Sequence, residues 1–242
     1  MRRITFSEGE YYHIYNRGVD KRDVFTSPHE YRRFQYALAL LNDCDTSQVS
    51  HMLRKAEVNL LREHYSEAKP LNNARGRKSL RIHRGDSREP LVAIGAYCLM
   101  PNHFHLYVTP LVENGISRFM QRLQTSYTMY FNEQHERSGA LFQGTFKAQH
   151  VDRNAYARYL FSYIHLNPAK LKDPKWKERG ARDLRALRTY VREYPYSSLG
   201  EYLGDRRVIT DPTRFPAYLS DASDVDEHID VWLSTREDFS EV

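Results

Sequence analysis

Cysteine is scarce in this 242-residue chain, which holds only Cys44 and Cys98. Two thiols cannot build a disulfide framework or a four-thiolate zinc site, so both classes of stapled protein are excluded. Long hydrophobic runs are missing too, since the longest, Leu91 to Met100, is far shorter than the ~20 residues of a membrane-spanning helix. Residues 1–16 lack the apolar segment of a signal peptide. These absences predict a protein of the reducing cytoplasm with no membrane partner.

Glycine-rich phosphate-binding motifs are absent as well. The chain has neither a P-loop nor a dinucleotide fingerprint, so no nucleotide cofactor is expected. Tyrosine, by contrast, is abundant at 18 residues, and charge is unevenly spread. Residues 1–199 carry a net charge of +12 and residues 200–242 carry −7. A basic body favours a polyanionic partner such as nucleic acid, although solubility alone explains the charge equally well.

The pattern of hydrophobic residues and turn residues predicts an order of strands and helices. Strands are expected at 11–15, 90–100, 103–109 and 141–151, and helices at 28–42, 47–67, 115–134, 153–166 and 225–233. Asp152 is the expected N-cap of the helix over 153–166. Apart from the helices at 47–67 and 225–233, this order suits an α+β fold, a ferredoxin-like or RRM-like antiparallel sheet with helices on one face.

The same pattern predicts how the chain is divided. Residues 1–200 form one domain, which is interrupted by a helical and basic insertion at about 43–89. Residues 201–242 form an acidic C-terminal extension. Within the insertion, residues 69–88 hold seven basic residues and one acidic residue among glycine and proline breakers, which is typical of a loop.

Two histidines stand two positions apart at the start of the strand expected over 103–109. Residues at this spacing on a strand point to the same face, so the imidazoles of His103 and His105 can reach one metal ion. Phe104 then points into the core. Such a pair also arises by chance among eleven histidines, but the hydrophobic strand and the Pro101-Asn102 turn before it give this pair a rigid mount.

A third ligand must come from another element, and the helix that stops at Pro168 offers one. Tyr163 and Asn167 are four residues apart and therefore lie on one helical face. The amide oxygen of Asn167 can complete a metal site, and the phenol of Tyr163 can lie beside whatever the metal polarises. An ordinary interpretation competes with this one, because Tyr163 also belongs to an apolar stripe and Asn167 before proline is a common helix stop.

Four blocks of sequence, in order, resemble a known family. They are YHIYNRG at Tyr12 to Gly18, AYCLMPNHFHLYV at Ala96 to Val108, LFQGTFK at Leu141 to Lys147 and YIHLNP at Tyr163 to Pro168. The blocks are similar to those of the IS200-like transposases, and closest to the branch called REP-associated tyrosine transposases. These are Y1 members of the HUH endonuclease superfamily. The resemblance covers roughly residues 11–202.

The resemblance implies a ferredoxin-like enzyme that acts on single-stranded hairpin DNA. It implies that His103, His105 and Asn167 hold Mg²⁺ or Mn²⁺ and that Tyr163 is the nucleophile, forming a 5′-phosphotyrosine intermediate in DNA transposition or repeat mobilisation. In the family both monomers and homodimers occur, and the sequence leaves that choice open.

Basic side chains near these blocks are candidates for contacts with DNA phosphates. They are Arg17, Arg118, Arg122 and Lys147 in the domain and Arg75, Arg77 and Lys78 in the insertion. The aromatic residues Tyr12, Tyr15, Phe142 and Phe146 fall in expected strands, where they are more often core residues than stacking platforms for bases.

Two other functions are compatible with the sequence. One is a domesticated protein that binds DNA hairpins without catalysis, and the other is an RNA-binding module built like an RNA-recognition motif. The intact set of His103, His105, Tyr163 and Asn167 favours the enzyme, because a protein that only binds has no use for all four.

Overall fold

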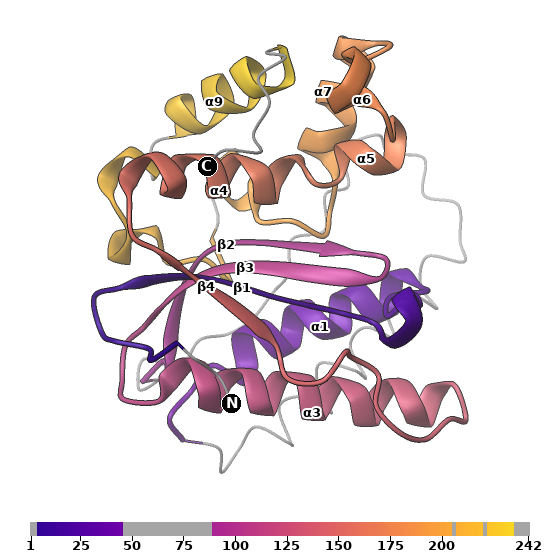
Figure 1. Cartoon of the computed structure of the whole chain (residues 1–242), viewed down its shortest axis with the longest axis vertical. Coiled ribbons are helices and arrows are strands. Elements are labelled where there is room, and N and C mark those ends of the chain that lie inside the picture. Colours follow the sequence, from indigo (N-terminus) through magenta and orange to yellow (C-terminus); the bar gives the residue numbers. More distant parts are fainter. Residues whose placement is uncertain (1–3, 46–88, 205–206, 220–221, 235–242) are drawn as a thin grey trace.

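A four-stranded antiparallel sheet forms the centre of the molecule (Figure 1). The computed structural model describes residues 4–45, 89–204, 207–219 and 222–234. Its strands lie in the order β2-β3-β1-β4. They are β1 (Tyr11–Arg17), β2 (Val92–Met100), β3 (His103–Pro110) and β4 (Lys147–Val151). The fold is of the α+β class, and this strand order is the one expected for a ferredoxin-like sheet.

The hairpin of β2 and β3 is tight because Pro101 and Asn102 alone connect the strands, so that Met100 lies opposite His103. The backbone carbonyls of Pro101 and Asn102 accept hydrogen bonds from the amides of Val24 and Gly18 in the chain that follows β1. The turn is thereby fixed to the end of the central strand, which positions the start of β3.

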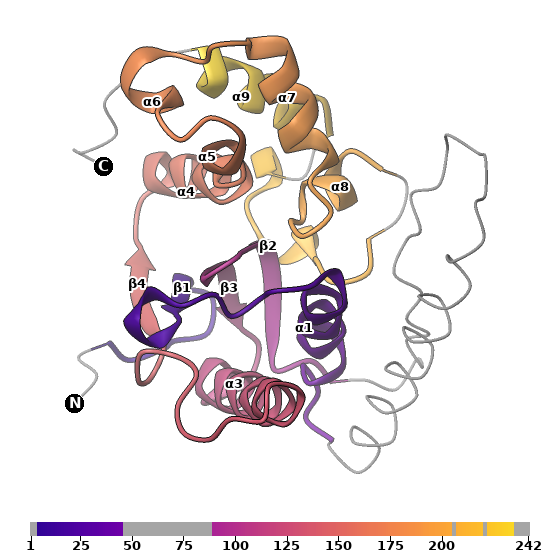
Figure 2. The ribbon, with the colours of Figure 1, turned by 90° about the vertical axis from the view of Figure 1, so that its right-hand side faces the viewer.

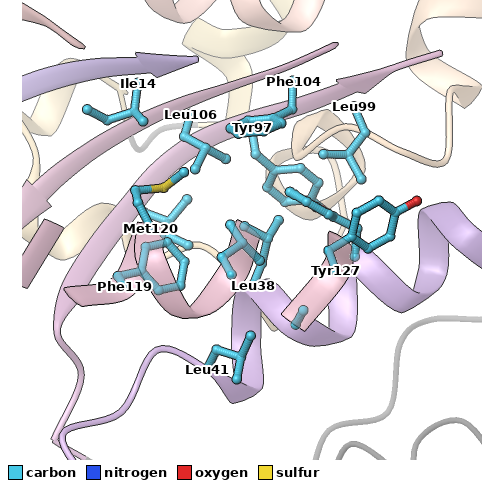
Figure 3. Close-up of a cluster of buried hydrophobic side chains, with 14 of the residues drawn as sticks. Ile14, Leu38, Leu41, Tyr97, Leu99, Phe104, Leu106, Phe119, Met120 and Tyr127 are labelled. Carbon is cyan, nitrogen blue, oxygen red and sulfur yellow. The ribbon is translucent and has the colours of Figure 1, made fainter. Parts of the chain in front are cut away.

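Two helices cover one face of the sheet, α1 (Pro28–Leu40) and α3 (Gly115–Gln134). Ser27 caps α1, since its side chain accepts a hydrogen bond from the Glu30 amide. The apolar stripe of α3, which includes Phe119 and Tyr127, packs with side chains from α1 and the sheet into a buried cluster (Figure 3). The expected bounds of α3 are confirmed, and α1 ends within two residues of its expected end.

The opposite face is also covered, by α4 (Asn154–Leu166) and by helices near the C-terminus (Figures 1 and 2). The expectation of helices on one face is therefore wrong in this respect. The reason lies in β2, where all nine residues are buried: a strand apolar on both sides needs a layer on each. A second buried cluster fills this layer and joins Tyr107 of β3 to Leu160 of α4 and Val191 of α7.

Several short helices lead away from α4 and build the rest of this second layer. They are α5 (Ala169–Lys172), α6 (Trp176–Arg179), α7 (Leu184–Glu193), α8 (Leu199–Tyr202) and α9 (Ala222–Ser234), with 3₁₀ turns at η1 (Val19–Lys21), η2 (Pro212–Arg214) and η3 (Ala217–Leu219). None of the helices in the described residues is long and apolar enough to cross a membrane. The helix expected at 225–233 corresponds to α9.

Two expectations at the fourth strand are wrong. The strand begins at Lys147 and not at Leu141, because Phe142 and Phe146 turn into the buried cluster and Gly144 adopts a positive φ of 65°. The N-cap of α4 is Arg153, which makes no side-chain capping bond, and not Asp152. The helix expected at 47–67 and the basic loop at 69–88 lie outside the described residues.

The described residues after position 200 pack on the same two clusters as the rest of the chain. Ile209 belongs to the cluster under α1 and α3, whereas Phe215, Val225 and Ile229 belong to the cluster under α4. A separate acidic extension at 201–242 stays a prediction, but its described part contributes apolar side chains to the core.

Candidate active site

The two histidines of β3 face α4, on the side of the sheet opposite Phe104. Phe104 is fully buried among the side chains of Figure 3, as the alternation of the strand predicts. The ring centroids of His103 and His105 lie 5.0 Å apart with the rings nearly perpendicular. The pair therefore shares one face, with both rings at the level of the β2–β3 turn.

His103 is held by the residue before it. Its Nδ1 lies 2.6 Å from Oδ1 of Asn102, and because an amide oxygen only accepts hydrogen bonds, Nδ1 carries the proton. Burial, followed by the positive charges of Arg17 and Lys170, lowers the pKa of His103 to about 4. The ring is then neutral near pH 7, and its Nε2 keeps a lone pair for a metal or a proton.

His105 is held by a third histidine that the sequence interpretation missed. Nε2 of His13, on β1, lies 2.8 Å from Nδ1 of His105, and the two rings stack with centroids 5.0 Å apart. Burial lowers the pKa of His13 to about 4 and that of His105 further below its usual range. With Nδ1–H of His105 donated to His13, Nε2 of His105 is a buried acceptor with no hydrogen-bond partner.

Tyr163 reaches this pair from α4. Its ring lies edge-on to the ring of His105, with centroids 5.3 Å apart. Burial raises the pKa of the Tyr163 phenol, and a hydrogen bond with the Asn167 side chain opposes that rise. Asn167 is buried at the end of α4, where its Nδ2 donates to the backbone carbonyl of Tyr163 over 2.8 Å. The structure thus joins the histidine pair to the tyrosine and asparagine one helical turn apart.

The donor set fits a divalent cation with a nitrogen-rich shell. The lone pairs of the two neutral imidazoles, above all the unpartnered Nε2 of His105, are suitable ligand atoms. Within the described part of the chain, no three side chains of the histidine, cysteine, aspartate and glutamate types cluster as a metal site. A third protein ligand would therefore be a neutral oxygen, for which Asn167 has the right chemistry.

Two of the expected phosphate contacts lie on this side of the sheet. Arg17 ends β1, is exposed and lies directly opposite His103. Lys147 lies opposite Tyr15 in the β1–β4 pair, and paired residues of neighbouring strands point to the same face. The half-buried ring of Tyr15 stands 5.9 Å from that of His105, whereas Tyr12, Phe142 and Phe146 are core residues.

The other expected phosphate contacts are not brought here. Arg118 and Arg122 belong to α3, which covers the opposite face of the sheet (Figure 1). The Arg122 guanidinium donates to the backbone carbonyl of Asp43. Arg75, Arg77 and Lys78 lie outside the described residues.

Sequence reasoning also missed Lys170 and Lys177. The charge of Lys170 acts on both histidines of β3, and Nζ of Lys177 lies 5.3 Å from the centre of the Tyr163 ring. A signal for Lys170 was present, because it follows Tyr163 by seven residues, or two helical turns. The signal for His13 was its alternation with Tyr11 and Tyr15, but only the register of β1 against β3 reveals its partner.

Comparisons with known proteins agree with this architecture. Residues 66–167 match the family model described as "Transposase IS200 like". No curated protein matches the chain. A solved structure of a REP-associated tyrosine transposase bound to a REP hairpin superposes with a TM-score of 0.50 at 14% sequence identity, covering 99% of this chain and 94% of the other. At that identity the superposition shows the shared fold.

Proposed function

Residues 66–167 belong to the IS200-like transposase family, and we propose that the chain cuts and rejoins single-stranded DNA at hairpins through covalent attachment to Tyr163. The observation that carries the proposal is the edge-on approach of the Tyr163 ring to His105, with centroids 5.3 Å apart. The hairpin bound by the structural neighbour supports hairpin DNA as the substrate. The basic body of the chain supports an anionic partner.

The proposed reaction is a transesterification at phosphorus. The phenol oxygen of Tyr163 attacks in line, a bond from this oxygen to phosphorus forms, and the bond from phosphorus to the 3′ oxygen breaks. The phenol gives up its proton and the departing 3′ oxygen gains one, which leaves a free 3′-hydroxyl and a 5′-phosphotyrosine. Because one phosphodiester replaces another, the reverse attack by a 3′-hydroxyl rejoins a strand without ATP.

Each residue of the site has a part in this proposal. His103, His105 and Asn167 would hold Mg²⁺ or Mn²⁺, which when bound polarises the scissile phosphate and stabilises the charge that develops on it. Asn102 and His13 fix the orientation and tautomer of the two imidazoles by hydrogen bonds of 2.6 and 2.8 Å. Asn167 holds the end of α4 and opposes the rise in the pKa of Tyr163.

An RNA-recognition module is a poorer fit to the structure. Such modules stack bases on an open face of the sheet. Here both faces are covered, and Tyr107, which an open sheet would display, is fully buried under α4 and the C-terminal segment. A domesticated hairpin-binding protein without catalysis differs from the enzyme only in whether Tyr163 becomes bonded to DNA.

That difference gives the first prediction. Incubation of the protein with labelled single-stranded hairpins and Mn²⁺ should yield a protein–DNA adduct that survives denaturant. Tyr163→Phe should abolish the adduct while hairpin binding and the melting temperature stay near those of the wild type, because the ring is kept and only the nucleophilic oxygen is lost.

Tyr159→Phe is the matched control. Tyr159 precedes Tyr163 by one helical turn on α4, and the two rings stack with centroids 5.8 Å apart. The control should form the adduct normally. An adduct formed by Tyr163→Phe but not by Tyr159→Phe would place the nucleophile on Tyr159, and no adduct with the wild type would leave the chain a hairpin binder.

A further inference from the structure

Lys170 continues the helical face that carries Tyr163 and Asn167. The backbone stays helical between α4 and α5, since φ and ψ are −52° and −41° at Asn167 and −60° and −23° at Pro168. Positions 163, 167 and 170 are separated by four and three residues, so they follow one face of this continuous turn. The side chain of Lys170 is therefore the next one along the row from the proposed nucleophile.

The ammonium of Lys170 is close to the histidine pair. Its positive charge contributes to the lowered pKa of both His103 and His105, after burial and, for each ring, another neighbouring charge. Arg17 adds a second positive charge beside His103 from the end of β1. A cationic surround of this kind suits an anion bound against the two imidazoles.

Lys177 approaches the same place from α6. Its Nζ lies 5.3 Å from the centre of the Tyr163 ring and 5.6 Å from that of Trp176. Trp176 is buried and so fixes α6 in place, while the ammonium is held against the two aromatic faces. Desolvation and the charge of Lys170 lower the pKa of Lys177 to about 8, which still leaves it mostly protonated at neutral pH.

Two ammonium groups thus lie near Tyr163 and repel each other across the space that a substrate phosphate has to enter. We propose that Lys170 and Lys177 bind the phosphodiester that Tyr163 attacks, an assignment that rests on the proposed function. An anion between the two groups relieves their repulsion and receives charge-assisted hydrogen bonds. The same contacts hold phosphorus beside the phenol oxygen and offset the negative charge that grows during the attack.

The test compares two substrates on the uncleaving Tyr163→Phe protein. The linkage that the wild type cleaves is first mapped on an unmodified hairpin, and a second hairpin then carries a single uncharged methylphosphonate at that linkage. Lys170→Gln and Lys177→Gln should each weaken binding of the unmodified hairpin by roughly tenfold, as expected for a charge-assisted contact. Each should weaken binding of the methylphosphonate hairpin by less than about twofold.

Lys172→Gln is the matched control for the change in net charge. Lys172 lies on the same short helix as Lys170 but faces a pocket of about 430 Å³ that is lined by Asp183 and Ala186 of the α7 region. It should weaken both hairpins equally. Lys177→Arg keeps the positive charge and should restore most of the binding, which separates the charge of Lys177 from its packing on Trp176.

The outcomes separate this assignment from the proposed function. If Lys170→Gln and Lys177→Gln affect both hairpins equally, as the control does, the assignment is overturned, while an adduct that depends on Tyr163 still supports the enzyme. If the wild type forms no adduct with the unmodified hairpin, the proposed function fails and the assignment fails with it. A loss confined to the charged linkage, with rescue by Lys177→Arg, supports both.

Discussion

At the scale of single residues, the two histidines of β3 differ in what holds them. His103 depends on its chain neighbour Asn102, whereas His105 depends on His13 from another strand, 92 positions away in the sequence. A ligating histidine owes its tautomer and orientation to the partner of its second nitrogen. His13 therefore belongs to the site although it has no place in the His103–His105 pattern.

A substitution of His13 tests this dependence. His13→Phe keeps an aromatic ring in the buried position but removes the acceptor for Nδ1–H of His105. We expect affinity for Mn²⁺ to fall by about 10–100-fold, the usual cost of losing such a partner, with the melting temperature nearly unchanged. Isothermal titration of the metal-free protein with Mn²⁺ measures the change.

His150→Phe provides the comparison for that experiment. His150 lies on the neighbouring strand β4 and is exposed, with its Nε2 2.6 Å from a carboxylate oxygen of Glu10. It should leave Mn²⁺ affinity unaltered. Equal affinities of His13→Phe and the wild type would mean that His105 does not need His13 to bind the metal.

At the scale of elements, α4 carries the chemistry and is fixed from both sides. Toward the sheet, Nε2 of the buried His165 lies 2.6 Å from Oγ of Ser198, and that oxygen accepts from the amide of Tyr97 on β2. On its other side α9 packs against it, with Trp232 near Tyr159. The position of Tyr163 over the histidines thus depends on contacts that come from the last third of the chain.

The contribution of α9 to stability is open to measurement. Ile229 is 1% exposed in the cluster around α4, and Val231, two residues further along the same helix, is 52% exposed. We expect Ile229→Ala to cost about 2–5 kcal/mol of unfolding free energy because it leaves a cavity. Val231→Ala should change it by less than about 0.5 kcal/mol. Urea unfolding followed by circular dichroism gives both values, and equally small losses would show that α9 does not support α4.

At the scale of the whole molecule, charge is sorted between the two ends of the chain. The acidic C-terminal segment does not simply remain in solvent: Asp230 of α9 pairs with Arg188 of α7 over 2.6 Å and with Arg192 over 3.6 Å. These are partly exposed pairs and contribute little stability by themselves. Their consequence is that part of the negative charge of residues 200–242 is held against a basic helix of the second layer.

The basic insertion gives a prediction at this scale, which rests on the sequence alone. Replacing Arg75, Arg77 and Lys78 together by glutamine should weaken binding to single-stranded hairpins of any sequence. Each phosphate contact releases condensed counterions, so the slope of log affinity against log salt should become shallower by about 2 for three lost contacts. Fluorescence anisotropy from 50 to 300 mM salt measures the slope, and a slope equal to that of the wild type would place these side chains away from the DNA.

Alternation and helical spacing in the sequence determined the strands, the shared face of His103 and His105, and the pairing of Tyr163 with Asn167 on one helix. These are local properties, because neighbouring residues fix which way each side chain points. The tertiary structure decided the second helical layer, the partner of His105 and the approach of Lys177 to Tyr163. Such contacts join residues far apart in the sequence, and they depend on strand register and on which helices cover β2, neither of which a local pattern encodes.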